Sequence, residues 1–206
     1  MANVRSALLG ARNLKKDAVR DRLLDSFIEL MLEGDGAAIN HDRIADRAGV
    51  GRRTVYRYFP DREALMAAVT ERVRERAGPQ VVMPRSMEEL LATLEPIYTG
   101  FDRIAGIATV LRSTPQGRAL RQSDKDVRTK AYRAATAEAV KDLPAEDQLL
   151  ATAMFQVLHT TPWLEMRDNW GLTGEQIARA TCWAVRALLA DLRQRKDRPL
   201  DELIQG

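Results

Sequence analysis

The chain has few of the side chains that form disulfides and metal sites. Cys182 is its only cysteine, so neither an intramolecular disulfide nor a cysteine-rich zinc site can form. This cysteine content fits a reducing compartment, and we expect a cytoplasmic protein. His41 and His159 are the only histidines, which excludes a histidine-rich metal site. We therefore expect neither a metal nor another cofactor.

The sequence also lacks a long apolar run. Its longest stretch without a charged residue, Leu149 to Leu164, has 16 residues and includes three threonines, so it is too short and too polar to span a bilayer. Near the N-terminus, "ALLGA" is too short for the apolar core of a signal peptide. The mean hydropathy of −0.33 agrees with a soluble chain. We expect no membrane partner.

No β-strand pattern of useful length and no internal repeat occurs in the sequence. Ala, Leu, Arg, Glu and Asp dominate, and apolar residues recur at spacings of three and four, as in amphipathic helices. The sequence therefore predicts an all-α fold. The expected helices are 15–33, a short helix capped by Asn40, 52–58, 62–77, 87–101, 104–113, 118–142, 145–169 and 174–196.

Positive charge is unevenly distributed, although the formal net charge is only +3. Residues 1–16 contain four basic residues and no acidic one, and residues 49–62 contain four arginines against Asp61 alone. Localised charge of this kind suits a polyanion. A solvated basic face is the alternative, but it would not need the two tyrosines that residues 52–58 also carry.

Two short expected helices, joined by the turn at residues 49–51, have the shape of a helix-turn-helix. Helices of about two turns are not stable alone, so they must pack against other elements. Ile44 and Ala48 of the first helix and Val55 and Phe59 of the second are placed to face inward, where helix 15–33 can cover them. The outward face of the second helix then carries arginine and threonine, which can contact base edges, and tyrosine, which suits phosphates.

The stretch "INHDRIADRAGVGRRTVYRYFPDREALMAAV" resembles the N-terminal DNA-binding domain of the TetR family of bacterial transcriptional regulators. The resemblance covers roughly residues 15–70, and its motifs occur in register. These motifs are Ile44-Ala45, Ala48-Gly49-Val50, Thr54-Val55-Tyr56-Arg57-Tyr58-Phe59 and Arg62-Glu63-Ala64-Leu65.

The resemblance implies a role for each matching residue. Tyr56 is similar to the family's phosphate-contacting tyrosine, Arg62 to a basic residue that meets the DNA backbone, and Asn40 to the capping residue that can approach a phosphate. Gly51 replaces the more usual Ser or Thr cap, a change of only a few tenths of a kcal/mol. Arg53 stands where many members have a small residue, so no operator sequence can be carried over. The implied recognition surface is Arg52, Arg53, Thr54, Arg57 and Tyr58.

The resemblance also implies how the chain is divided. We expect a basic N-terminal arm at residues 1–14, a helix-turn-helix DNA-binding domain at 15–78 that includes the linking helix 62–77, and a helical ligand-binding and dimerisation domain at 79–206. The segment "AGPQVVMP", with two prolines and a glycine, is the best linker candidate.

The last expected helix carries apolar residues on two faces. Ile177, Ala184 and Leu188 mark one stripe, and a second stripe lies on another face, so the helix is expected to be buried on two sides. We expect the second stripe and helix 149–164 to form a four-helix dimer interface, as in the family. A monomer that buries both helices is the alternative. The second stripe is Ala180, Trp183, Ala187 and Ala190.

Pro162 interrupts the otherwise apolar helix 149–164, and such an interruption could line a cavity for a small-molecule effector. For any single residue, a packed core with satisfied polar groups is the simpler interpretation. Trp170 could instead pack at a helix end. The candidates for the cavity are Tyr98, Phe101, Arg112, Met154, Phe155, His159, Thr160, Trp163 and Met166.

Taken together, these patterns predict a homodimeric, non-enzymatic transcriptional regulator. It would bind a palindromic operator in double-stranded DNA and be released by a small-molecule ligand; the choice of repressor over activator rests on the resemblance. A DNA-binding protein indifferent to sequence would share the basic surface. An all-α enzyme with an incidental helix-turn-helix is the other alternative, but the sequence has no glycine-rich phosphate loop after a strand, and Cys182 lies in an apolar helix where an inert thiol is expected.

Overall fold

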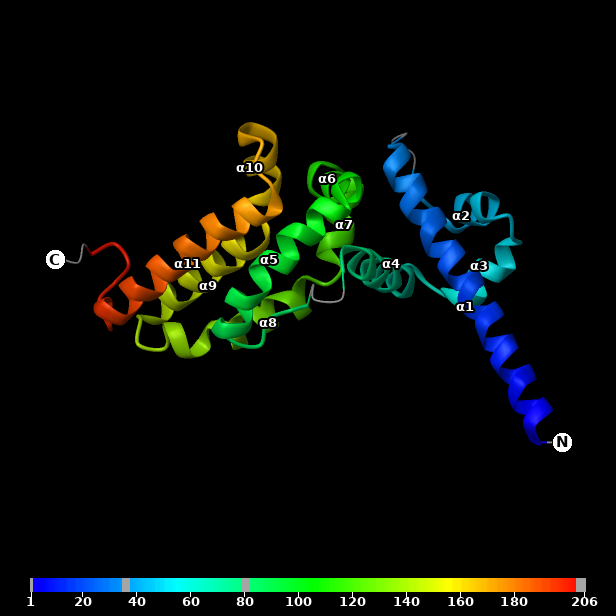
Figure 1. Ribbon diagram of the computed structural model, residues 1–206, viewed down its shortest axis with the longest axis horizontal. Helices are drawn as coiled ribbons and strands as arrows, with labels where there is room; N and C mark the ends of the chain where they lie inside the picture. The colour runs from blue at the N-terminus through cyan, green and yellow to red at the C-terminus, as the bar shows by residue number, and fades with distance from the viewer. Residues whose placement is uncertain (1, 35–37, 79–81, 203–206) are drawn as a thin grey trace. The chain divides into compact units, whose positions relative to one another are not determined.

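A computed structural model describes residues 2–34, 38–78 and 82–202, with side chains from Lys16 onward. This part of the chain is helical and contains no strand, which confirms the all-α prediction (Figure 1). None of the described helices is long and apolar enough to cross a membrane. The helices are α1 (Ala2–Glu33), α2 (His41–Ala48), α3 (Arg52–Tyr58), α4 (Arg62–Ala77), α5 (Met87–Arg103), α6 (Ala105–Ser113), α7 (Pro115–Gln122), α8 (Lys125–Val140), α9 (Ala145–Thr160), α10 (Trp163–Trp170) and α11 (Gly174–Arg195).

Three predicted helices differ from the structure by more than two residues or are divided in it. Helix α1 begins at Ala2 and not at Lys15, because residues 2–14 contain no proline and are rich in helix formers. The predicted helix 118–142 is two helices, α7 and α8, with Ser123 and Asp124 between them. The predicted helix 145–169 is likewise divided into α9 and α10, because Pro162 has no amide hydrogen to continue the helical bonds.

The chain folds into two compact units. The first contains the residues up to Val73 together with Val110–Ser123, and the second contains Arg74–Thr109 and the residues from Asp124 onward.

The core of the first unit forms where α1 covers the short helices α2 and α3. Leu24 and Ile28 of α1, Ile44 of α2 and Val55 of α3 are completely buried, as the sequence pattern predicts. Ion pairs hold the elements at the surface: Arg47 of α2 lies 2.7 Å from Glu33 of α1. The helix-turn-helix pair therefore depends on α1 for its stability, because helices this short cannot stand alone.

The core of the second unit is built from α5, α8, α9 and α11. Gly174 at the start of α11 lies so close to α5 that an added Cβ would be 2.5 Å from the Tyr98 carbonyl oxygen. Thr173 and Gln176 form a capping box at this helix start. The main cluster is Leu90, Tyr132, Val140, Leu143, Ala151, Phe155, Val185 and Leu192.

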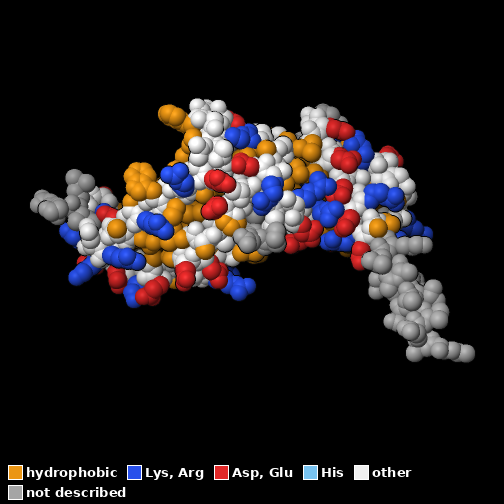
Figure 2. All heavy atoms as spheres, in the orientation of Figure 1, with side chains coloured by type: hydrophobic (Ala, Val, Ile, Leu, Met, Phe, Trp, Pro, Cys, Tyr) orange, Lys and Arg blue, Asp and Glu red, His pale blue; other side chains and the backbone are white. Residues whose placement is uncertain are grey.

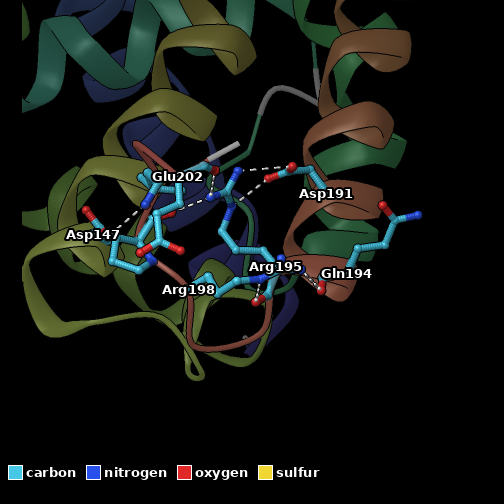
Figure 3. A network of polar contacts seen from close by, with 8 residues as sticks. Asp147, Asp191, Gln194, Arg195, Arg198 and Glu202 are labelled. Atoms are coloured by element: carbon cyan, nitrogen blue, oxygen red, sulfur yellow. Dashed lines mark hydrogen bonds and ion pairs between the residues drawn. The ribbon is translucent and has the colours of Figure 1, made fainter. Parts of the chain in front are cut away.

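Figure 3 shows how the last described residues fold back on α11. The buried Arg195 donates from Nε to the Asp191 carboxylate (2.9 Å) and from Nη1 to the Glu202 carbonyl oxygen (2.8 Å). The Leu200 amide donates to Asp147 Oδ2 at 2.9 Å, which ties this segment to the first turn of α9. A buried arginine needs such a complete set of acceptors, because an unpaired buried charge is costly.

Candidate functional site

The geometry of the helix-turn-helix follows from its caps. Asn40 is the N-cap of α2, and its Oδ1 accepts a hydrogen bond from the Arg43 amide at 3.0 Å. Gly49 ends α2 in the left-handed conformation (φ +63°), which glycine adopts without steric cost. Gly51 is the N-cap of α3 and makes no side-chain cap bond, as expected. The turn is therefore set by two glycines and one half-buried valine, Val50.

Helix α3 has a buried face and an exposed face. Val55 and the following Phe59 are buried, whereas Arg52, Arg53 and Arg57 are exposed. Tyr56 is 40% exposed, and Thr54 and Tyr58 are half-buried at the edges of this face. The structure thus brings the predicted recognition residues together on one short helix.

A connected set of contacts orients Tyr56. Its ring is stacked on His41, with 4.4 Å between the centroids and 9° between the planes. His41 Nε2 lies 3.2 Å from the Phe59 carbonyl oxygen, which can only accept, so His41 carries its proton on Nε2. The Tyr56 hydroxyl accepts from Arg52 Nη2 at 3.3 Å. His41 thereby links the start of α2 to the end of α3.

The arginines of this face differ in how firmly they are held. Arg52 forms an ion pair with Asp42 at 2.9 Å, and its pKa is raised by the hydrogen bond to Tyr56 and then by the Asp42 charge. Arg57 lies over the Tyr58 ring, 5.4 Å from the centroid. Arg53 makes no hydrogen bond or ion pair with the other residues that the structure describes. Arg53 can therefore move without breaking a hydrogen bond or ion pair to a described residue.

Asp61 caps the start of α4, since its Oδ1 accepts from the Ala64 amide at 2.8 Å. This cap puts Arg62, which is exposed, at the first position of the helix. Asn40 is also exposed, and its bond to Arg43 leaves its amide hydrogens directed elsewhere. Both residues are therefore exposed at helix starts, and their contact with a DNA backbone stays a prediction.

In the second unit, Tyr98 compensates for Pro162. Because Pro162 has no amide hydrogen, the carbonyl oxygen of Leu158, four residues earlier, lacks its helical donor. The Tyr98 hydroxyl donates to that oxygen, and the Tyr98 side chain is completely buried. At the helix interruption that was predicted to line a cavity, the carbonyl oxygen of Leu158 therefore has a donor within the protein.

His159 lies at the centre of a second buried network. Its Nδ1 is 2.5 Å from the Tyr132 hydroxyl, and its Nε2 is 2.9 Å from Thr93 Oγ1. The Thr93 hydroxyl donates to backbone carbonyl oxygens of its own helix, so Thr93 Oγ1 accepts the hydrogen bond from His159 Nε2. The Tyr132 hydroxyl then donates to His159 Nδ1. Burial lowers the pKa of His159 to about 4, which keeps the ring neutral.

The remaining cavity candidates lie in different surroundings. Trp163 is buried and donates from Nε1 to Asp102 (2.7 Å), while Phe101 packs on its ring with 5.7 Å between the centroids. Met154 is 49% exposed, and Arg112 belongs to the first unit. Phe155 is in the core, and Thr160 and Met166 are half-buried. Their role in ligand binding stays a prediction.

The predicted apolar faces of α9 and α11 lie at the surface of the second unit. Trp183 is 76% exposed, Ala187 and Ala190 are exposed, and Ala180 is half-buried. Helix α9, which carries no charge from Leu149 on, leaves one side uncovered. The exposed apolar side chains on that side are Leu149, Leu150, Met154 and Val157.

Two features were not predicted from the sequence. One is the contact of His41 with Tyr56; the only available signal was an aromatic residue at the first position of α2. The other is a groove of about 860 Å³ between α5 and α11, lined by Leu91, Glu95, Arg179, Cys182, Trp183 and neighbouring residues. The groove was missed because α5 and α11 are distant in sequence.

The N-terminal part of the chain has known relatives. Residues 23–69 match the profile of the bacterial regulatory proteins of the tetR family. An uncharacterized HTH-type transcriptional regulator of Mycobacterium tuberculosis is 38% identical over 69 residues, 34% of this chain and 34% of that protein. The HTH-type transcriptional repressor KstR of Rhodococcus jostii is 33% identical over 78 residues, 36% of this chain and 37% of that repressor. The matches thus span only about a third of the relatives' length.

Over most of its length, the chain also resembles a solved structure in its fold. Native NalD, the secondary repressor of the MexAB-OprM multidrug efflux pump in Pseudomonas aeruginosa, superposes with a TM-score of 0.63 over 84% of this chain and 96% of NalD. The two sequences are 17% identical, so the likeness concerns the fold alone.

Proposed function

We propose that the chain is a regulator of the TetR family, a sequence-specific repressor released from its operator by a small molecule, because residues 23–69 match the DNA-binding part of that family. The observation that carries this proposal is the exposed face of α3, where three arginines stand opposite a buried Val55. A helix of this size fits the major groove, and arginine can bind guanine edges with paired hydrogen bonds.

Base reading and backbone contact fall to different residues. Arg53 is unpaired with other described residues and is the proposed base reader that distinguishes this operator from others. Tyr56, Arg62 and Asn40 are the proposed phosphate contacts, which fix position without carrying sequence information. His41 holds the Tyr56 ring before DNA arrives, so less conformational freedom is lost on binding.

A dimer would present two copies of the exposed α3 face to the DNA and so increase its specificity. We place the dimer interface on the exposed apolar sides of α9 and α11, because side chains such as Trp183 and Leu150 are rarely left in water without a partner. Two recognition helices about one DNA turn apart, roughly 34–36 Å, would then read a palindromic site.

Release from the operator follows from thermodynamic linkage between the binding of DNA and the binding of the small molecule. A small molecule that binds the second unit more tightly in a conformation unable to span both half-sites shifts the population away from DNA. By reciprocity, operator DNA weakens the binding of that small molecule by the same factor.

Selection of binding sites from random DNA, followed by footprinting at two salt concentrations, tests the proposal. Phosphate contacts weaken steeply with salt for any DNA, whereas a repressor keeps its preference for the selected site. We expect the selected sites to be palindromic. Equal affinity for selected and random DNA would indicate a sequence-indifferent DNA-binding protein instead.

A further inference from the structure

The groove between α5 and α11 combines an apolar floor with a charged rim. Its buried and half-buried lining residues are apolar, and the exposed lining residues are mainly charged. One wall is formed by Trp183 and Ala187 of α11. The floor is Leu91, Leu94, Ala178 and Cys182, and the charged rim is Glu95, Glu175, Arg179 and Arg186.

Trp183 lines this groove and has three alanines beside it on the same side of α11. Its side chain is 76% exposed, whereas Trp163 of the same unit is completely buried. Ala180, Ala187 and Ala190 lie on the same side of α11 at helical spacing. Figure 2 shows apolar side chains gathered over the second unit, interspersed with charges of both signs. The surface thus carries a large apolar projection next to an apolar depression.

We propose that Trp183 of one protomer enters the α5–α11 groove of a second copy of the chain, and that the second copy makes the same contact in return. This inference rests on the proposed dimer and adds α5 to an interface otherwise built from α9 and α11. A two-fold interface joins a surface to itself, so the surface must contain both the projection and its receptor. The side of α11 that carries Trp183 also borders the groove.

The rim charges favour a second copy over other partners. Glu95 and Glu175 would repel a polyanion, and Arg179 and Arg186 would repel a polycation. A rotated copy of the same rim can place each arginine near a glutamate. The contact also involves α5, whose Arg103 donates from Nε to the Ala77 carbonyl oxygen at 3.0 Å. Helix α5, which lines the groove, is therefore also bonded to the last turn of α4.

Sedimentation equilibrium of the full chain tests this contact with three variants. Trp183→Ala should raise the dimer dissociation constant at least about 30-fold, as expected for a central aromatic residue. Ala92→Trp fills the groove from α5, where Ala92 is exposed, and should weaken the dimer comparably without changing α11. Trp170→Ala is the matched control, since Trp170 is 77% exposed but does not line the groove, and should leave the dissociation constant unchanged.

A second measurement does not depend on filling the groove. In Trp170→Phe, Trp163 is buried and Trp183 is the exposed fluorophore, so acrylamide quenching should fall several-fold when the concentration is raised through the dimer range. A dimer in which Trp183 remains fully quenchable would overturn the proposal. So would a folded Ala92→Trp variant that dimerises like the wild type, even if Trp183→Ala weakens the dimer.

These outcomes are separate from those of the proposed function. If the wild-type chain selects a palindromic site but Ala92→Trp dimerises normally, only the groove contact is wrong. If the wild-type chain dimerises through the groove but binds all DNA equally, the repressor proposal is wrong and the contact stands.

Discussion

The two units of the chain expose opposite kinds of surface. In the first unit, α3 buries Val55 and presents arginine and tyrosine to solvent. In the second unit, α9 and α11 leave Leu150, Met154 and Trp183 exposed. A charged face suits DNA, which supplies charge and hydrogen-bond acceptors, whereas an apolar face suits another protein surface. The difference supports the proposal that DNA recognition and self-association use separate surfaces of the chain.

The two histidines show the same difference on a smaller scale. His41 is half-buried, stacks on Tyr56 and bonds to a backbone oxygen at the edge of the DNA-binding face. His159 is completely buried, and both of its ring nitrogens are hydrogen-bonded to side chains. We therefore expect substitution of His159 to change stability, and substitution of His41 to change DNA binding.

The largest expected effect is that of His159→Ala. The change leaves a cavity and removes the partners of Tyr132 and Thr93, so we expect about 2–5 kcal/mol less free energy of unfolding. Urea denaturation checks this value. The control Val127→Ala, at an exposed position of α8, the helix of Tyr132, should cost less than about 1 kcal/mol. Equal losses would contradict a buried network.

The pH dependence of stability is expected to follow from the same histidine. The pKa of His159 is about 4 in the folded chain, below the value of about 6.5 for an unfolded histidine. Its contribution is therefore complete above about pH 6.5 and is lost as the pH falls towards 4, by up to about 3 kcal/mol. Denaturation of wild type and His159→Gln across this window should show a steeper loss for the wild type. Parallel curves would mean that His159 is not held neutral by burial.

On the DNA-binding face, Arg53→Ala should relax the preference for the selected operator by about 1–3 kcal/mol at one base position. Tyr56→Phe should weaken binding to all sequences by a similar factor, because a phosphate contact carries no sequence information. Competition binding with operator variants measures both. An equal loss on every sequence for Arg53→Ala would contradict its role as a base reader.

The smallest expected effect is that of His41. His41→Phe keeps an aromatic ring against Tyr56 and should bind operator within about twofold of wild type, whereas His41→Ala should lose about 0.5–1.5 kcal/mol of affinity. Fluorescence anisotropy on operator DNA distinguishes the two. If both variants bind alike, the stack does not orient Tyr56. Unchanged thermal unfolding of the two variants controls for a general loss of structure.

Local patterns predicted the short helices α2 and α3 of the first unit closely, although α1 begins earlier than they indicated. Asn40 marks a helix start through its own chemistry, and the three- and four-residue spacing identified Val55 as buried. The same reasoning was less successful in the second unit. The predicted helices 118–142 and 145–169 are each divided. The Tyr98 hydroxyl donates to the carbonyl oxygen of Leu158, a contact that the sequence did not predict, and the role of Tyr98 in a cavity stays a prediction.

The success of sequence-based prediction depends on how far apart along the chain the interacting residues lie. The sequence by itself determined the all-α class, the helix caps and the outward arginines of α3, because each depends on residues within about one helical turn. Only the tertiary structure decided that His41 supports Tyr56, that His159 is enclosed by Tyr132 and Thr93, and that Trp183 stands beside a groove. These contacts join residues distant along the chain, and their geometry is set by how whole helices pack.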